Sequence, residues 1–156
     1  MQLPMGFWIR SREEVQSANP VVDPHIVISI NTPGDGPADV VRNDNTLFVM
    51  PFFFDDLDGD PGEAYRAYME RDAVLFNEDM AGDIIEALRD QVDPAERTIK
   101  GIVVHCDAGI SRSAGVGAAL ALWFNGEEQL YGRGLVPNKL VYRTMLNVLQ
   151  QKGLIG

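Results

Sequence analysis

Residues 101–124, GIVVHCDAGISRSAGVGAALALWF, place a short strand pattern almost directly before a long helix pattern. The first part, GIVVH at 101–105, is typical of a central parallel strand that is buried on both faces. From Ser113 onward the sequence is apolar nearly all round, so a helix formed there must be buried as well. The chain therefore has to fold around this stretch, with other elements covering it.

Three further segments are predicted strands, because they are rich in branched and aromatic residues and are bounded by turn-forming residues. They are FWIR at 7–10, HIVISI at 25–30 and TLFVMPFF at 46–53. Helical patterns lie between and after these strands. Strands that alternate with helices predict an α/β fold, a central, mostly parallel sheet flanked by helices.

Three other helices are predicted from capping residues and apolar periodicity. Ser11 and Glu14 form a capping box for a short helix that ends near Gln16. Asn77 caps a second helix, and 137–151 forms an amphipathic helix that closes the chain. The apolar positions expected to face the core are Met80, Ile84, Leu88 and Val92 in the second helix, and Leu140, Val141, Met145, Val148 and Leu149 in the last.

The length of 156 residues, 46% of them apolar, fits one domain spanning 1–156. The formal net charge of −10 argues against nucleic acid or an anionic membrane as a partner. A single cysteine forms no internal disulfide, and the first ten residues lack the pattern of an export signal, so we expect a cytoplasmic protein. The apolar stretch at 115–124 is about half the length of a bilayer crossing. The sequence leaves the oligomeric state open.

The turn between the predicted strand and helix has the features of an anion site. A loop that leaves a central strand and enters a helix aims several backbone N–H groups at one point, where the helix dipole adds positive charge. Gly109 can adopt the left-handed conformation that lets consecutive amides converge. The same field favours a thiolate at Cys106, which predicts a nucleophile competent near neutral pH. The planar fork of Arg112 can hold two oxygens of a tetrahedral anion.

The stretch HCDAGISRS at 105–113 matches the His-Cys-x5-Arg-Ser signature of the cysteine-dependent protein tyrosine phosphatases. It most resembles their compact dual-specificity branch, in its bacterial and phage-type form. Weaker similarity covers most of the chain: the ISI strand, FDD after another strand, the helix before the loop, and PN at the start of the last helix. The resemblance implies a hydrolase of phosphotyrosine, alone or with phosphoserine and phosphothreonine, in proteins or small phosphomonoesters. It implies no metal and no cofactor.

The resemblance also implies a role for each residue of the signature. Cys106 would attack phosphorus to form a phosphocysteine, which water then hydrolyses. Ser113 would hydrogen-bond the sulfur and ease its departure, and His105 would orient the loop from behind. The phosphate-binding loop would consist of Asp107, Ala108, Gly109, Ile110, Ser111 and Arg112.

This family draws its general acid from an aspartate on a separate upstream loop. The stretch PFFFDDLDGDPG offers four candidates: Asp55, Asp56, Asp58 and Asp60. If the strand continued, alternation would direct the side chain of Asp56 to the same side as those of Phe52 and Phe54. The resemblance also places the family's acid at the second acidic position after the strand. We therefore predict Asp56, with Asp55 as the alternative. The long segment 59–76 departs from the most compact relatives and leaves this choice open.

Three other polar features receive structural interpretations. Asn138 is predicted to cap the final helix, with support of the catalytic loop as a second role. His25 is predicted to be a structural residue in a loop or partly buried. The acidic run 56–60 has the alternating spacing of a calcium loop, but Pro61 occupies the required glycine position and Ala67 that of the closing glutamate, so no metal site is expected.

Two other classes of protein stay open. A non-catalytic phosphate-binding module would keep the anion loop, although binding alone does not need a thiolate. A rhodanese-like or arsenate-reductase-like enzyme would use a similar loop, although no second cysteine is present to resolve an intramolecular disulfide. The resemblance also implies that phosphoinositides are disfavoured as substrates, since members of the superfamily that act on them place lysines in this loop, whereas this loop has none and the protein is acidic.

Overall fold

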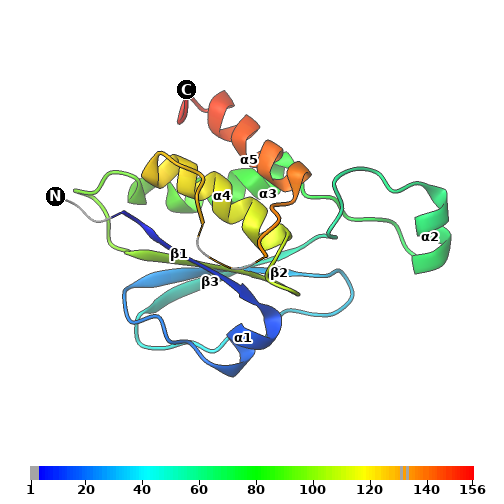
Figure 1. The fold of residues 1–156 in the computed structure, drawn as a ribbon, viewed down its shortest axis with the longest axis horizontal. Coiled ribbons are helices and arrows are strands. Elements are labelled where there is room, and N and C mark those ends of the chain that lie inside the picture. The colour runs from blue at the N-terminus through cyan, green and yellow to red at the C-terminus, as the bar shows by residue number, and fades with distance from the viewer. Residues whose placement is uncertain (1–3, 131, 133) are drawn as a thin grey trace.

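Four parallel strands form the central sheet of the computed structural model, which describes residues 4–130, 132 and 134–156 (Figure 1). The strand order is β1-β4-β2-β3, so that β4 pairs with both β1 and β2. Every residue of β2 and β4 is buried, as expected for strands covered on both faces. The strands are β1 (Gly6–Ser11), β2 (His25–Asn31), β3 (Thr46–Phe53) and β4 (Gly101–Cys106). All four predicted strands are confirmed, and the described sheet is wholly parallel.

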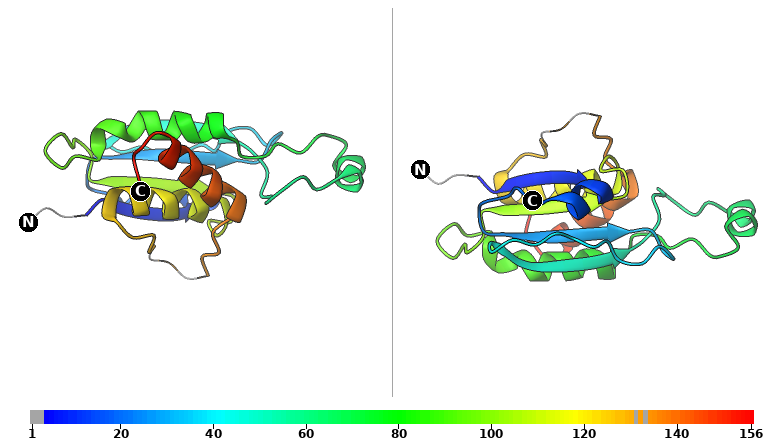
Figure 2. Two further views of the ribbon diagram at one scale, coloured as in Figure 1. Left: turned by 90° about the horizontal axis from the view of Figure 1, so that it is seen from above. Right: turned by 90° about the horizontal axis from the view of Figure 1, so that it is seen from below.

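Two long helices lie against one face of the sheet, a third packs over both of them on the side away from the sheet, and one short helix lies on the other face (Figures 1 and 2). The three are α3 (Glu78–Leu88), α4 (Arg112–Asn125) and α5 (Lys139–Gln151), and the short one is α1 (Arg12–Ser17). On the α1 face, Val15 and Val21 pack against Val27 and Val103 of the sheet. The described chain is thus a compact α/β domain with a parallel sheet between helices.

The capping residues act as the sequence predicts. Ser11 and Glu14 form a reciprocal capping box at the start of α1, which ends one residue later than expected. The Asn77 side chain accepts a hydrogen bond from the N–H of Met80, and that of Asn138 accepts one from Val141.

Three details of the predicted core pattern were wrong. Helix α3 ends at Leu88 and a 3-10 turn, η1 (Arg89–Gln91), follows, so Val92 lies beyond the helix at the edge of the core. Leu140 is only partly buried, whereas its neighbour Val141 in the first turn of α5 is fully buried. His25 is fully buried, because Asn19, Thr46 and the carbonyl of Asp23 satisfy its ring nitrogens.

Helix α2 (Glu63–Met69) was not predicted from the sequence. It lies on an extension away from the body of the domain (Figures 1 and 2), and none of its seven residues is buried. An apolar stripe marks helices that pack on a core. Because α2 packs on none, its sequence has no such stripe to reveal it.

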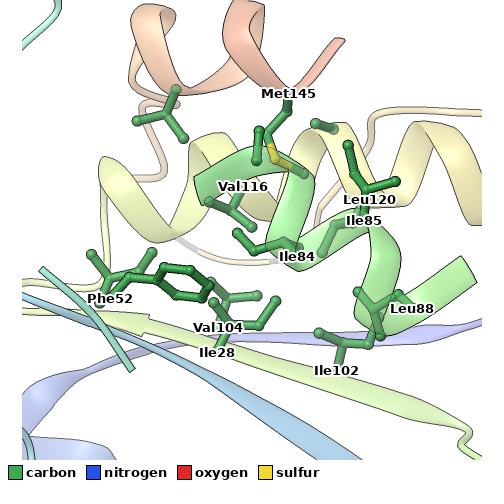
Figure 3. Close-up of a cluster of buried hydrophobic side chains, with 14 of the residues drawn as sticks. Ile28, Phe52, Ile84, Ile85, Leu88, Ile102, Val104, Val116, Leu120 and Met145 are labelled. Atoms are coloured by element: carbon green, nitrogen blue, oxygen red, sulfur yellow. The ribbon is translucent and has the colours of Figure 1, made fainter. Parts of the chain in front are cut away.

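The main core lies between the sheet and the three long helices (Figure 3). Ile28, Ile102 and Val104 rise from the sheet toward side chains of α3 and α4, such as Ile84, Leu88 and Val116. Met145 of α5 reaches down toward Val116 of α4 and Ile84 of α3. No helix in the described part of the chain has both the length and the apolar character needed to cross a membrane.

Replacing Met145 by alanine tests this interdigitation. Met145 is fully buried, so Met145→Ala leaves a cavity between α3, α4 and α5 and should lower the free energy of unfolding by about 2–5 kcal/mol. The matched control, Asn147→Ala, alters an exposed residue of the same helix and should change it by less than about 0.5 kcal/mol. Denaturant titrations measure both. Equal effects of the two substitutions would contradict the packing described here.

Candidate functional site

The polar residues of interest gather where the parallel strands end. Strand β4 ends at Cys106, and helix α4 begins at Arg112 after a short loop. The chain leaves β2 at Thr32 and β3 at Phe54, and the carboxyl ends of parallel strands meet at one edge of a sheet. The candidate site is therefore the loop 106–112 together with the segments that contact it.

Gly109 gives this loop a conformation that residues with a side chain rarely adopt. Its φ is +71°, as the sequence predicts. A Cβ at this position would lie 2.6 Å from the backbone carbon of Arg10 and 2.7 Å from the N of Ser11. The loop thus packs directly on the end of β1, and both the angle and the space require glycine.

Three carbonyl groups of the loop are held by backbone N–H groups of neighbouring segments. The pairs are Asp107 O with Arg12 N at 3.1 Å, Ile110 O with Val136 N at 3.0 Å, and Ser111 O with Asn138 N at 3.0 Å. In a trans peptide the next N–H points opposite to the carbonyl. The N–H groups of Ala108, Ser111 and Arg112 therefore face away from these partners.

Cys106 lies at the start of the loop and is 2% exposed. Its Sγ is 3.0 Å from Oγ of Ser113, a residue in the first turn of α4. A serine hydroxyl can donate a hydrogen bond to a thiolate, which accepts only. The structure thus pairs the sulfur with the serine that the sequence signature singles out.

His105 lies beneath the loop in a fully buried position on β4. Its Nε2 is 2.6 Å from Oγ of Ser29, the residue opposite it on β2, and its Nδ1 is 3.4 Å from the carbonyl of Cys106. Because a carbonyl only accepts, this network assigns the ring proton to Nδ1. Burial lowers the pKa of His105 to about 4, so the ring is neutral near pH 7.

Arg112 is 5% exposed, although it carries a permanent charge. Its Nη1 donates to the carbonyl of Phe54 at 2.8 Å and to Oγ1 of Thr32 at 3.1 Å. Its Nη2 donates to Oδ2 of Asp107 at 3.1 Å. Among the buried side-chain donors and acceptors that the structure describes, Nε of Arg112 is left without a partner. Buried donors are nearly always satisfied, so an unpartnered one indicates a position where a ligand atom can bind.

Asp107 brings a negative charge to the same loop. It accepts hydrogen bonds from Thr32 and Arg112. Burial acts to raise the pKa of Asp107, but these two hydrogen bonds and the positive charges of Arg112 and Arg12 together outweigh it and hold the pKa below its usual value. The carboxylate therefore offsets part of the Arg112 charge.

The two candidate acids, Asp55 and Asp56, lie in different surroundings. Asp55 is 4% exposed and forms an ion pair with Arg71, whose hydrogen bonds lower the pKa of Asp55. Asp56 is exposed, and its Oδ1 accepts a hydrogen bond from the hydroxyl of Ser111 at 2.8 Å. The side-chain alternation assumed for a continuing strand does not apply to these two residues, because β3 ends at Phe53 and the chain turns. Asp56, not Asp55, thus contacts the loop.

Asn138 combines both of its predicted roles. Its Oδ1 caps α5, while its Nδ2 donates to Oδ1 of Asp56 at 2.9 Å and to the carbonyl of Leu57 at 3.2 Å. Its backbone N–H binds the carbonyl of Ser111. Asn138 therefore links three parts of the chain: the segment 56–57, the loop 106–112 and the last helix.

The sequence interpretation missed three residues of the site. Thr32 was recognisable in principle, because it follows the predicted strand 25–30 at the edge where strand ends meet. Ser29 was recognisable as a polar residue within an apolar strand. Arg71 carried no such signal, because it reaches Asp55 only through a long excursion of the chain.

A scan of protein-family models, a search of curated proteins and a search of solved structures each found no match for this chain. Within residues 4–130, 132 and 134–156, no group of three or more His, Cys, Asp and Glu residues is placed to hold a metal ion. The assignment of function therefore depends on the site itself.

The buried neutral state of His105 predicts a pH dependence of stability. An unfolded histidine has a pKa near 6.5, so between about pH 6.5 and pH 4 the unfolded chain binds a proton that the folded protein does not. Stability should fall as the pH drops through this window, by about 3 kcal/mol in total. A His105→Gln variant should lack this part of the decline when unfolding is measured from pH 7 to pH 4. Parallel curves for the two proteins would refute the assignment.

Proposed function

We propose that this protein is a metal-independent phosphatase that hydrolyses phosphomonoesters through a phosphocysteine on Cys106. The observation that carries the proposal is the unpartnered, buried Nε of Arg112, in the same loop as a cysteine paired with Ser113. Arg112 Nη1 is already fixed by Phe54 and Thr32, which leaves the Nε side of the guanidinium for an anion. The resemblance of 105–113 to the tyrosine phosphatase signature agrees with this interpretation.

The loop backbone supports binding of a phosphoryl group. The N–H groups of Ala108, Ser111 and Arg112 face away from the segments that hold the adjoining carbonyls, and Gly109 bends the chain between them. The start of α4 adds its positive dipole at the same place. We assign the phosphate-binding role to this loop, with Arg112 as its charged donor.

In the proposed reaction the Cys106 thiolate attacks phosphorus, and the bond from phosphorus to the leaving oxygen breaks. That oxygen takes a proton from a general acid. Water then attacks the phosphocysteine, which releases inorganic phosphate and regenerates the thiolate. Ser113 donates a hydrogen bond to the departing sulfur, and neutral His105 supports the carbonyl of Cys106 without exchanging a proton.

We assign the general acid to Asp56. Its contact with Ser111 places it at the loop, whereas Asp55 is directed to Arg71. An acid must hold a proton before it can donate one. The ion pair with Arg71 keeps Asp55 ionised, which makes Asp55 the weaker candidate.

Two exposed apolar side chains at the loop, those of Ile110 and Val136, support phosphotyrosine in proteins as the preferred substrate. Ile110 is 41% exposed and Val136 is 65% exposed, and a hydrogen bond joins their backbones. Two apolar side chains beside a phosphate site suit the aromatic ring of phosphotyrosine. Asp107 and the net charge of −10 disfavour substrates with several phosphates. A free thiol as nucleophile also suits the reducing cytoplasm, the location that we propose.

Turnover of p-nitrophenyl phosphate tests the proposal directly. Wild-type protein should hydrolyse it in the presence of a metal chelator, and Cys106→Ser should reduce kcat/KM by on the order of 10⁴-fold or more, because the nucleophile is lost. Thermal unfolding of the variant serves as the control for folding. Binding of a phosphotyrosine peptide by the wild type without any turnover would instead identify a non-catalytic phosphate-binding module.

The assignment of the acid is tested by the pH profile of kcat/KM for phenyl phosphate, whose leaving oxygen needs a proton. Asp56→Asn should lower kcat/KM by about 10²–10⁴-fold and abolish the decline at higher pH that reports deprotonation of the acid. Asp58→Asn, a change at an exposed carboxylate nearby, is the matched control. If Asp55→Asn removed that decline while Asp56→Asn retained it, Asp55 would be the acid.

A further inference from the structure

We infer that Arg71, acting through Asp55, is a positioning residue for the general acid Asp56, an inference that rests on the function proposed above. Residues 57–73, here called the arm, leave the domain after Asp56 and return at Val74. The arm contains α2 and extends away from the body of the domain in all three views (Figures 1 and 2). The ion pair between Asp55 and Arg71 joins the chain just before the arm to the end of the arm.

The contact between these two side chains is bidentate. Nη1 of Arg71 donates to Oδ2 of Asp55 at 2.9 Å, and Nη2 donates to Oδ1 at 2.7 Å. Parallel hydrogen bonds of this kind fix orientation as well as distance. Asp55 is almost fully buried, so its carboxylate depends on these donors in place of water.

The backbone at the base of the arm is fixed by the same residue. The N–H of Asp55 donates to the carbonyl of Val74 at 2.7 Å, and the N–H of Val74 donates to Oδ2 of Asp55 at 2.9 Å. The carbonyl of Asp55 also accepts from the N–H of Leu57 at 3.0 Å. The backbone N–H, the backbone carbonyl and the carboxylate of Asp55 are therefore all bonded.

Asp56 lies between this fixed residue and the loop 106–112. Its side chain contacts Ser111 and Asn138, and the orientation of its backbone follows from the hydrogen bonds of Asp55. Without Arg71, Asp55 would be a buried carboxylate with no charged partner, which favours rotation of this segment toward water. The acid would then lose its alignment with the leaving oxygen, although every residue that touches the phosphoryl group would be intact.

Tyr65 of α2 also interacts with Asp55 and Arg71, but the rest of the arm contributes little to holding this geometry. None of the residues of α2 is buried, and its ion pair between Arg66 and Asp72 is exposed on both sides. Exposed ion pairs contribute little to stability. Arg66 therefore provides a matched control, an arginine of the same arm that is paired with an aspartate away from the site.

The test compares two substrates that differ in their need for an acid. Arg71→Ala should lower kcat/KM for phenyl phosphate about tenfold or more, because general acid catalysis contributes about 10²–10⁴-fold. For p-nitrophenyl phosphate, whose leaving group needs little protonation, the loss should be within about threefold. Arg66→Ala should match the wild type on both substrates. Equal losses on both substrates in Arg71→Ala would overturn the inference.

Coupling between the residues gives a second readout. In an Asp56→Asn background, Arg71→Ala should cause no further loss on phenyl phosphate, because the acid that it positions is already absent. Arg71→Lys, which keeps the charge but not the bidentate contact, should lie between the wild type and Arg71→Ala, and it replaces the alanine variant if that one does not fold. Fully multiplicative losses in the double variant would overturn the inference.

The same experiment separates this inference from the proposed function. An inactive wild type overturns both. An active wild type that is inactivated by Cys106→Ser supports the phosphatase, and the substrate-dependent loss in Arg71→Ala then decides the role of Arg71 alone.

Discussion

The buried guanidinium of Arg112 holds the site together. A charged group can stay buried only where hydrogen bonds replace water, and Arg112 finds them in three separate segments: Thr32 after β2, Phe54 after β3, and Asp107 in its own loop. These segments end side by side because the sheet is parallel. The guanidinium thus links the strand ends to one another, and its unpartnered nitrogen, Nε, is where the proposed phosphoryl group would bind.

The layout of the fold follows from local sequence patterns. Strands buried on both faces, such as 101–105, are recognised by their continuous apolar sequence. Ser11 and Asn77 begin helices through hydrogen bonds to N–H groups three residues further on, so the signal is local. Gly109 was predictable for the same reason, because its role depends on its own backbone angle. The choice of Cys106 and Arg112 as candidates depended on spacing, which the sequence contains in full.

Features that depend on distant segments were not predictable in this way. The strand phase used for Asp55 and Asp56 failed because β3 ends at Phe53, an end that tertiary hydrogen bonds determine. The pairing of Asp55 with Arg71 joins two points separated by the arm, and nothing local in the sequence encodes it. Helix α2 also escaped prediction, since a helix without a buried face has no apolar periodicity.

The carbonyls of Ile110 and Ser111 are held by residues that immediately precede the final helix. During synthesis, a chain that has emerged only as far as α4 has no partner for the Ile110 carbonyl, and the Ser111 carbonyl has only the N–H of Gly115 in α4, although Cys106 and Arg112 are already present. The order of translation therefore delays completion of the loop 106–112 until the segment before α5 is in place, so the geometry on which the proposed activity depends is among the last features that a nascent molecule acquires.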